Sequence, residues 1–475
     1  MSVVRSLRIR LGRTEVGSLF GLDDGRVYFR FDDAYAKNPS RPVQSQLYVV
    51  APATEGSAER VAQAVAEAEA ATVAQLLDPA LDANRGDGSF GLPPFFQNLL
   101  PEGPLRKQLI GDLGLEVNDE LGLLAACGGD LPGDVWADAE TLEDSALGRL
   151  IGQSRDSYEM SSGQVPTPQQ TSISGVQPKV ALVQGAAGRY VMRSRRSGGR
   201  HFIGKLPTAE YDRLPEVEYS ALRLAAAAGV NTCDASLQPL SAIADQLPYA
   251  LQKDERNFLL VSRFDRDVDT ETRRLHMEDF AQVTGTPSEY KYSGTYAAIG
   301  LLLKRRSARG EADVAELLRR IKVSELLGNY DAHLKNFSLV YLPGQARPEL
   351  SKAYDIVAYG VYFKGSGHGL QFFPGQKPRT LLTPATLRQL ANAWDIPEKQ
   401  LREVVADCID RAMRSWPGLL KTLPLSPAHR ARLAAYIESN ASVSSWRKRH
   451  PGAEWFQDDL SATPAAGPPP PAGAA

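Results

Sequence analysis

The chain has 475 residues, of which 43% are hydrophobic, 23% are charged and 8% are aromatic, and its formal net charge at pH 7 is −2. These are the values of an ordinary globular protein, and the length predicts two or three domains rather than one small core. A charge so close to zero provides no global basic field, so direct binding to nucleic acid or to a membrane surface is disfavoured.

The cysteines and the apolar residues indicate the compartment. The three cysteines, Cys127, Cys233 and Cys408, are far apart and form no CxxC pair, which excludes a disulfide framework and disfavours a zinc site. The first residues place arginines where a signal peptide needs an apolar run, and no 18 consecutive residues are apolar. We therefore expect a protein of the reducing cytoplasm that does not contact a membrane.

In chain order, strands are predicted first. Residues 7–11 and 27–31 alternate apolar and polar side chains, and the Asp-Asp-Gly run at 23–25 marks a turn between strands. Residues 57–77 change to helical spacing within a stretch rich in alanine and glutamate. A further helix, interrupted by a turn, is predicted from about residue 120.

The middle of the chain predicts a linker followed by short strands. Residues 152–170 are rich in Ser, Gln and Pro and have little apolar periodicity, which predicts a mobile linker. Strands are predicted at 179–183, 190–192 and 202–206, and after about residue 215 the pattern becomes mostly helical.

The C-terminal part is predicted to be helical up to about residue 440. An apolar stripe from Val314 to Ile321 ends near Gly328, a suitable C-cap residue. The last residues, 461–475, are a low-complexity run of proline and alanine that cannot bury a core, so we expect them to be disordered.

The polar residues that follow Gly328 form the densest candidate site. Asp331 and Asn336 are five residues apart, which is the D-x-x-x-x-N spacing of kinase catalytic loops. A carboxylate at 331 could accept the proton of a substrate hydroxyl, and amide oxygen is a suitable ligand for Mg²⁺. Asp355 has apolar neighbours that predict a strand, and it could supply another metal ligand. The alternative is a helix end capped by polar loop residues, with Asp355 at a strand end.

A kinase must also hold a triphosphate. GxxxxGK[ST] does not occur, which disfavours a P-loop NTPase. The match to GxGxxG at residues 86–91 lies in a glycine- and proline-rich segment, which disfavours a Rossmann site and the usual protein-kinase glycine loop. Instead, small residues at 171–175 precede Lys179 and a strand. Such a turn can present backbone N–H groups to phosphate oxygens, although an ordinary hairpin turn has the same composition.

Two further strands carry candidate residues. Lys205 lies in an apolar strand, where its side chain either reaches solvent or meets an anion. Glu216 and Glu218 open the next helix, and either could orient this lysine as a helix glutamate does in kinases. The apolar run 259–261 leads into a polar turn, which predicts either an inter-lobe hinge or a core strand that ends in arginine.

Taken in order, six segments of the chain resemble the HipA family of toxin kinases, and the resemblance covers roughly residues 1–440. The matching segments are QNLLPEG at 97–103, GGDLPG at 128–133, SISGVQPK at 172–179, SRFDR at 262–266, LHMEDF at 275–280 and GNYDAHLKNFS at 328–338. The resemblance implies an α+β, two-lobed protein-kinase-like fold, related to phosphoinositide 3/4-kinases, with a β-rich N-terminal subdomain and a mainly helical C-lobe.

The resemblance also implies a division of the chain. Residues 1–125 would form the N-terminal subdomain, with a helical insertion at about 50–90 that the family usually lacks. Residues 126–265 would form the kinase N-lobe with the phosphate loop and hinge, and residues 266–445 the C-lobe with the catalytic loop. Residues 446–475 would be a disordered tail.

The family's functional residues map onto this chain one by one. Asp331 is the implied catalytic base, supported by His333 and Lys335, and Asn336 and Asp355 are the implied Mg²⁺ ligands. The implied ATP-binding residues are Lys205, the phosphate-loop residues Gly175, Val176, Gln177, Pro178 and Lys179, and the backbone of Ser262 and Phe264 at the hinge.

A regulatory site is implied in the same loop. Ser172 matches a serine whose autophosphorylation silences the kinase in the family, and Ser174 is a second candidate. A phosphate adds about −1.5 to −2 charge beside an ATP-phosphate site, so repulsion gives a physical reason for inhibition.

The implied partners are a helix-turn-helix antitoxin of the HipB kind, through which DNA is bound, and a protein substrate of the aminoacyl-tRNA synthetase class. Two alternatives remain at this stage: a catalytically weak kinase-like scaffold that binds the antitoxin, and a small-molecule kinase with the same core. Because Lys205, Asp331, Asn336 and Asp355 are all present, the scaffold is the less favoured reading.

Overall fold

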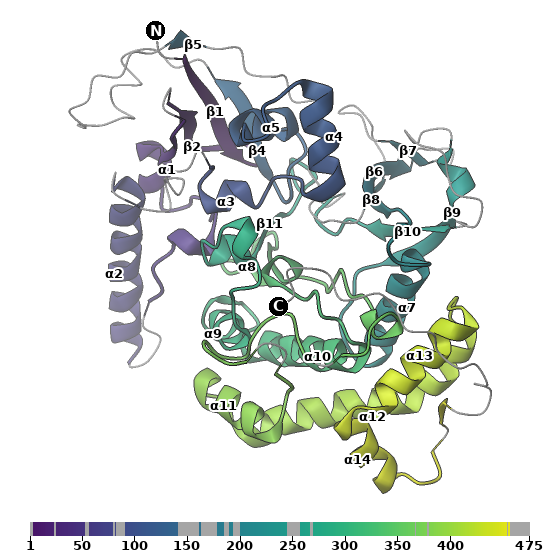
Figure 1. Ribbon diagram of the computed structural model, residues 1–475. Helices are drawn as coiled ribbons and strands as arrows, with labels where there is room; N and C mark the ends of the chain where they lie inside the picture. The colour runs from purple at the N-terminus through teal and green to yellow at the C-terminus, as the bar shows by residue number, and fades with distance from the viewer. Residues whose placement is uncertain are drawn as a thin grey trace.

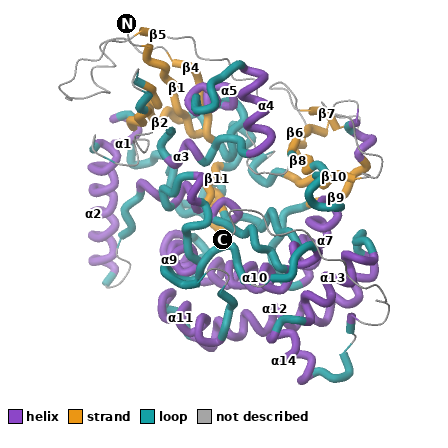
Figure 2. Tube along the Cα trace, in the orientation of Figure 1, coloured by secondary structure: helices purple, strands orange, loops and turns teal. Residues whose placement is uncertain are grey.

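The structure is a computed structural model, and three groups of elements build it (Figure 1). A strand-rich N-terminal part and a second, smaller sheet lie side by side, and a layer of helices lies below both (Figure 2). The structure describes residues 3–22, 25–52, 57–78, 81, 91–140, 161–162, 178–184, 190–192, 200–244, 257–266, 269–365, 367–377, 380–453 and 455–456.

The N-terminal sheet is antiparallel, with strand order β3-β2-β1-β4, and a short strand β5 also pairs with β1 in parallel. The alternation of apolar and polar residues in β1 reflects its two faces, as predicted. Leu7 and Ile9 are buried, whereas Arg8 on the other face pairs with Asp32 and Glu140. The strands are β1 (Val3–Leu11), β2 (Thr14–Gly21), β3 (Val27–Phe31), β4 (Val135–Glu140) and β5 (Ser161–Ser162).

Helical elements pack around this sheet. The predicted helix at 57–77 is confirmed, because α2 spans Ala58–Leu77 and begins at Ser57, whose side chain accepts a hydrogen bond from the N–H of Arg60. The other helical elements are α1 (Asp33–Lys37), η1 (Gln46–Tyr48), α3 (Pro94–Gln97), α4 (Gly103–Leu113) and α5 (Glu120–Cys127).

The smaller sheet is also antiparallel, with strand order β7-β6-β8-β10-β9, and helix α7 (Leu214–Ala227) packs against it. Gly204 in β8 allows close packing, because a Cβ there would lie 2.9 Å from the Leu182 side chain and 3.4 Å from Phe258. The strands are β6 (Lys179–Gln184), β7 (Tyr190–Met192), β8 (Arg200–Lys205), β9 (Ala235–Pro239) and β10 (Asn257–Ser262), with η3 (Leu240–Ala242) after β9.

The C-terminal part is mostly helical, as predicted, and carries a small sheet ordered β11-β12-β13. No helix among the described residues is long and apolar enough to cross a membrane. The elements are β11 (His276–Asp279), α8 (Phe280–Val283), η5 (Ser288–Tyr290), α9 (Tyr296–Arg306), α10 (Glu311–Leu327), η6 (Leu334–Asn336), β12 (Ser338–Tyr341), β13 (Glu349–Leu350), η7 (Tyr359–Val361), α11 (Pro384–Trp394), α12 (Glu398–Thr422), α13 (Pro427–Glu438) and α14 (Ala441–Arg449).

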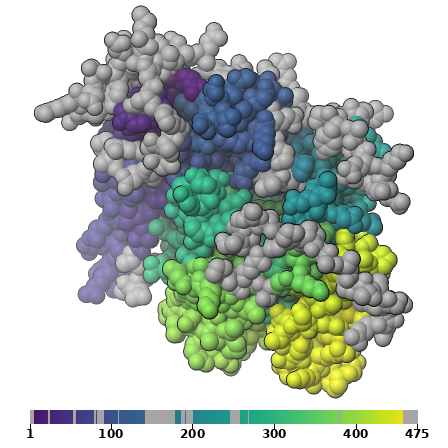
Figure 3. Space-filling model, viewed as in Figure 1, coloured from purple at the N-terminus to yellow at the C-terminus, as the bar shows by residue number. Residues whose placement is uncertain are grey.

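The N-terminal part contacts the C-terminal part closely, and the two surfaces adjoin in Figure 3. The carboxylate of Glu278 in β11 is fully buried and accepts hydrogen bonds from Ser45, from the N–H of Gln46 and from Tyr341. Gln282 in α8 donates to the carbonyl of Phe95 at 3.1 Å. Chain segments more than 180 residues apart are therefore joined by buried hydrogen bonds.

The predicted division into domains stays a prediction, and the pairing of strands suggests where its boundaries belong. Strand β4 pairs with β1, so the N-terminal sheet takes a strand from beyond residue 125. Helix α14 runs to Arg449, and Trp455 and Phe456 are buried in the core. We propose that the first unit extends to residue 140 and that the tail begins after residue 456. The predicted linker at 152–170 lies almost wholly outside the described residues.

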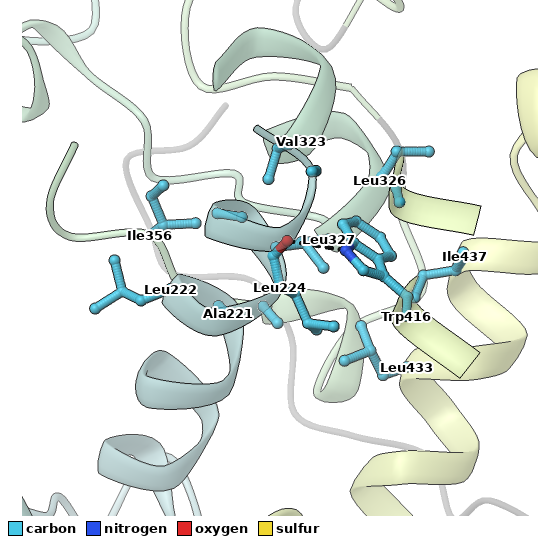
Figure 4. Close-up of a cluster of buried hydrophobic side chains, with 14 of the residues drawn as sticks. Ala221, Leu222, Leu224, Val323, Leu326, Leu327, Ile356, Trp416, Leu433 and Ile437 are labelled. Carbon is cyan, nitrogen blue, oxygen red and sulfur yellow. Dashed lines mark hydrogen bonds between the residues drawn. The ribbon is translucent and has the colours of Figure 1, made fainter. Parts of the chain in front are cut away.

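The largest core joins helix α7 to the C-terminal helices (Figure 4). Trp416 of α12 is fully buried, and its indole N–H donates to the carbonyl of Leu224 in α7 at 2.8 Å. Leu327 of α10 and Leu433 of α13 belong to the same cluster. Because α7 also lies on the smaller sheet, this core fixes that sheet relative to the helical layer.

Replacing this tryptophan should destabilise the whole chain. Trp416→Ala leaves a cavity and removes one hydrogen bond, so we expect the free energy of unfolding to fall by about 3–5 kcal/mol. Urea denaturation followed by circular dichroism measures it. Tyr290→Ala is the control, because Tyr290 is 61% exposed and its loss should change the value by about 0.5 kcal/mol or less. If both changes lowered the free energy of unfolding equally, Trp416 would not have the role in the core that we describe.

Candidate active site

The candidate catalytic loop begins where α10 ends, at Gly328. This glycine has φ +69°, and a Cβ here would lie 2.9 Å from both the backbone N of Gly360 and the ring of Tyr436. Gly328 is therefore the C-cap that the sequence predicts, and only glycine fits the turn. The chain then continues through Asp331 into η6 and the predicted strand, β12.

Hydrogen bonds within the loop fix Asn336. Its side-chain oxygen accepts from the N–H of His333 at 2.9 Å, and its side-chain nitrogen donates to Oδ2 of Asp355 at 2.8 Å. Asn336 and Asp355, which are 19 residues apart in the sequence and were predicted to be metal ligands, thus lie in contact. Burial lowers the pKa of His333 to about 3, so its ring is neutral at physiological pH.

The backbone at Asp355 differs from the prediction. Asp355 is not on a strand: it lies in an irregular segment between β13 and η7, with φ +58°. A left-handed residue cannot continue a strand, and aspartate tolerates this conformation better than most residues. Apolar neighbours gave the wrong secondary structure because they are buried for another reason, as Ile356 and Val357 belong to the main core.

Lys205 at the end of β8 contacts two carboxylates. Of the two predicted environments for this lysine, solvent or an anion, the structure therefore has the anion. Its ammonium group contacts Glu218 of α7 and Asp355, and both its side chain and that of Glu218 are almost fully buried. Glu216, the other candidate, instead accepts from Asn257 at 2.9 Å. Burial opposes the Lys205 charge, but the two carboxylates raise the pKa of Lys205 above its ordinary value.

The charge of Asp355 is fixed by the same cluster. Burial by itself would raise the pKa of Asp355, but Lys205 and Lys179 outweigh burial and hold that pKa well below its ordinary value. Asp355 is therefore ionised, and its carboxylate lies between a lysine and an amide. Oxygen donors of this kind suit a hard divalent cation.

Asp331 has a partner that the sequence did not indicate. The O–H of Tyr292 donates to Oδ1 of Asp331, and Tyr292 comes from the segment that precedes α9. Burial raises the pKa of Asp331 to about 6, against the opposing effect of the Tyr292 hydrogen bond. The carboxylate is thus largely ionised at pH 7. Tyr292 was missed because nothing in its local pattern distinguishes it from other loop tyrosines.

Lys335 binds the N-terminal part of the chain. Its ammonium group donates to Oε1 of Glu102 at 2.5 Å and to the carbonyl of Asn98 at 3.2 Å. Both partners belong to the segment QNLLPEG, one of the six segments that carry the family resemblance, for which no role was predicted. The structure therefore brings that segment to the candidate site.

Only the last two residues of the predicted phosphate loop lie within the part of the chain that the structure describes. Pro178 and Lys179 are described, and Lys179 lies opposite Lys205 in the β6–β8 pair. The carbonyl of Pro178 accepts from the N–H of Leu206 at 2.9 Å, which fixes the start of β6 beside Lys205. The remaining predicted residues lie outside the described residues: Ser172, Ser174, Gly175, Val176 and Gln177.

The predicted hinge follows β10. The N–H of Ser262 donates to the carbonyl of Asp234 at 2.9 Å, so a contact from Ser262 to a purine would use its carbonyl oxygen. The ring of Phe264 lies 6.0 Å from that of Tyr354, next to Asp355. The hinge and the catalytic cluster are thus neighbours, and the roles of Ser262 and Phe264 in ATP binding stay predictions.

The residues present fit the implied magnesium ion. Asp355 offers a carboxylate, and the amide oxygen of Asn336 has a second lone pair besides the one used by His333. Among the described residues, no group of three or more His, Cys, Asp or Glu side chains is gathered as a metal site. Mg²⁺ in phosphoryl-transfer sites commonly takes only one or two carboxylates and completes its shell with phosphates and water.

Comparison with known proteins identifies the class. Profiles of two protein families match the chain: "HipA N-terminal domain" over residues 7–137 and "HipA-like C-terminal domain" over residues 171–416. The second match alone covers more than half of the chain, so this protein belongs to the HipA family.

Individual relatives agree. A Sinorhizobium fredii (strain NBRC 101917 / NGR234) protein named "Putative kinase Y4dM" is 32% identical over 448 residues, which cover 93% of this chain and 97% of that protein. A second protein of that strain, Y4mE, is 32% identical over 288 residues, covering 57% and 64%.

A solved structure confirms the fold class. The HipA chain of the Shewanella oneidensis MR-1 HipA, HipB and operator DNA complex is similar with a TM-score of 0.60. The sequence identity is 19%, over 93% of this chain and 99% of that chain. The predicted α+β, kinase-like fold is therefore confirmed.

The Lys205 cluster generates a stability prediction. Lys205→Met leaves the buried Glu218 and the half-buried Asp355 without their shared cation, so the free energy of unfolding should fall by about 3–5 kcal/mol. Chemical denaturation measures the loss. Lys352→Met is the matched control, because Lys352 pairs with Asp234 at the surface and should cost about 1 kcal/mol or less. A Lys205→Met variant as stable as the control would contradict the analysis.

Proposed function

We propose that this protein is an ATP- and Mg²⁺-dependent Ser/Thr protein kinase that serves as the toxin of a toxin–antitoxin module. One observation supports the proposal above the others: Asn336, Asp355 and the Lys205–Glu218 pair are in contact, and the charge of Asp355 acts on Asp331, so residues from four separate segments form one cluster. These are the residue types and relations that phosphoryl transfer requires. A kinase-like scaffold without catalysis has no need of this arrangement.

Each residue has a proposed task. Asp331 accepts the proton of the substrate hydroxyl, and the O–H of Tyr292 holds one oxygen of that carboxylate. Asn336 and Asp355 would hold Mg²⁺, which supplies charge neutralisation at the transferred phosphoryl group. Lys205, oriented by Glu218, would contact the phosphates together with Lys179 and the backbone of the loop at 175–178. His333 and Lys335 keep the loop in place.

The proposed substrate is a translation-related protein of the aminoacyl-tRNA synthetase class, and the proposed partner is a helix-turn-helix antitoxin of the HipB kind. Family membership supports both. The Shewanella oneidensis complex contains HipA together with HipB and operator DNA, which gives an example of such an assembly within the family. The near-neutral net charge of this chain agrees with DNA contact made mainly through a partner.

The role of Asp331 is tested by Asp331→Asn, which keeps the shape of the side chain but removes its basicity. We expect phosphate transfer to fall at least ~100-fold, since a general base typically contributes ~10²–10⁴-fold. Transfer is measured by mass spectrometry after incubation with ATP and Mg²⁺, alone and with cell extract. Asp395→Asn, at an exposed position, is the control. If wild type itself transfers no phosphate in either incubation, the scaffold reading is favoured.

Autophosphorylation is proposed for Ser172 or Ser174 and is tested separately. In wild type, tryptic mass spectrometry should show a gain of phosphate on the peptide that contains both serines, followed by declining activity. The double change Ser172→Ala with Ser174→Ala should remove this label and keep the kinase active for longer. Persistent label between residues 171 and 179 in the double variant would rule out both serines.

A further inference from the structure

Glu102 receives three donors that come from two different segments of the C-terminal part. Its Oε1 accepts from Lys335 at 2.5 Å and from Ser288 at 3.1 Å, and its Oε2 accepts from Lys291 at 3.0 Å. Lys335 belongs to the catalytic loop, whereas Ser288 and Lys291 belong to the segment before α9. One carboxylate of the N-terminal part therefore joins both segments.

This cluster is largely shielded from solvent. The side chain of Glu102 is 17% exposed, that of Lys291 is 15% exposed and that of Lys335 only 3%. Burial by itself would raise the pKa of Glu102, but Lys335 and Lys291 outweigh burial and hold that pKa well below its ordinary value. The carboxylate is ionised, and shielding makes its contacts stronger than those of a surface ion pair.

The neighbours of Glu102 reinforce the same connection. The side-chain oxygen of Gln97 accepts from the N–H of Ser288 at 3.0 Å. The side-chain nitrogen of Asn98 donates to the carbonyl of Thr286 at 2.9 Å. Residues 286–291 are therefore held against the N-terminal part along their length, and not at one point.

From this segment the connection continues to the catalytic base by two routes. Tyr292 follows Lys291 directly, and its O–H donates to Oδ1 of Asp331. The carbonyl of Lys291 accepts from the N–H of Leu334, which lies between Asp331 and Lys335, at 3.1 Å. The segment that Glu102 contacts is therefore bonded both to the Asp331 carboxylate and to the loop that carries it.

We propose that Glu102 is a positioning residue, through which the N-terminal part sets the position of the Asp331 carboxylate by way of Lys335, Lys291 and Tyr292. The inference rests on the proposed function, because it assigns to Asp331 the role of base. The hydrogen bonds of Glu102 go to Lys335, Lys291 and Ser288 and not to Asp331. The loss of Glu102 should therefore lower the rate of transfer and leave nucleotide affinity unchanged.

The test compares Glu102→Gln with Glu69→Gln in the full chain. Glu69 has an exposed side chain that pairs with Arg41 of the N-terminal part, so it controls for the loss of one carboxylate away from the loop. We expect Glu102→Gln to slow phosphorylation of the 172–174 peptide at least ~10-fold, because small displacements of a reacting group are costly. The dissociation constant of a fluorescent ATP analogue should change by less than ~2-fold.

Two further variants separate positioning from a loss of folding. Glu102→Asp keeps the charge and should recover part of the rate. Glu102→Gln combined with Tyr292→Phe should cost less than the product of the two single effects, since both act on Asp331 by one route. A rate equal to wild type in Glu102→Gln, or a parallel loss of rate, ATP affinity and melting temperature, would overturn the inference.

A measurement that needs no activity completes the test. In Glu102→Gln, hydrogen–deuterium exchange should become faster in peptides covering 286–292 and 331–336, and remain as in Glu69→Gln elsewhere. If wild type transfers no phosphate but exchange responds in this way, the proposed function fails and the structural connection stands. Unchanged exchange in both peptides overturns the connection, whether or not the protein is a kinase.

Discussion

The ammonium group of Lys205 is removed from water, and the arrangement of the site depends on how that charge is compensated. A buried cation is tolerated only with anions in contact, and here they come from α7 and from the segment after β13. Satisfying one lysine therefore requires that the smaller sheet, helix α7 and the irregular segment at Asp355 meet at one point. The left-handed backbone of Asp355 lies at this meeting point.

The same cluster determines how the rest of the site is built. Asp355 reaches Asn336, Asn336 closes the turn at His333, and the loop so formed carries Asp331 at its start and Lys335 at its end. From Lys335 the contacts pass to Glu102 in the N-terminal part. A continuous series of hydrogen bonds and ion pairs thus runs through all three groups of elements, and each group contributes a residue that the others require.

The sequence predicted the secondary structure well where the pattern was periodic. The strands of the first 50 residues, the helix at 58–77 and the helix capped by Gly328 all follow from alternation, helical spacing and a glycine stop. The pair Asn336–Asp355 was predicted from spacing and from resemblance, and Lys205 from a charge in an apolar strand. The periodic elements needed only a local signal, whereas the pair Asn336–Asp355 needed the resemblance as well.

Other features could not be predicted, because they depend on contacts between distant segments. The choice of Glu218 over Glu216 depends on which side of α7 faces Lys205. Tyr292 reaches Asp331 across 39 residues, and Glu102 reaches Lys335 across 233. The strand predicted at Asp355 was wrong because its apolar neighbours are buried in the main core, whereas the backbone at Asp355 is left-handed and cannot continue a strand.

The contacts around the predicted hinge restrict how the smaller sheet can move. Arg266, just after the hinge, donates to the carbonyls of Leu131 and Gly133 and to the carboxylate of Asp130, all in the N-terminal part. On the other side, Trp416 binds α7 to the helical layer. A rigid-body tilt of the smaller sheet would have to unpack that tryptophan, and a twist beyond the hinge would have to carry the N-terminal sheet with it. Any opening and closing around the Lys205 cluster should therefore be confined to the segments that border it.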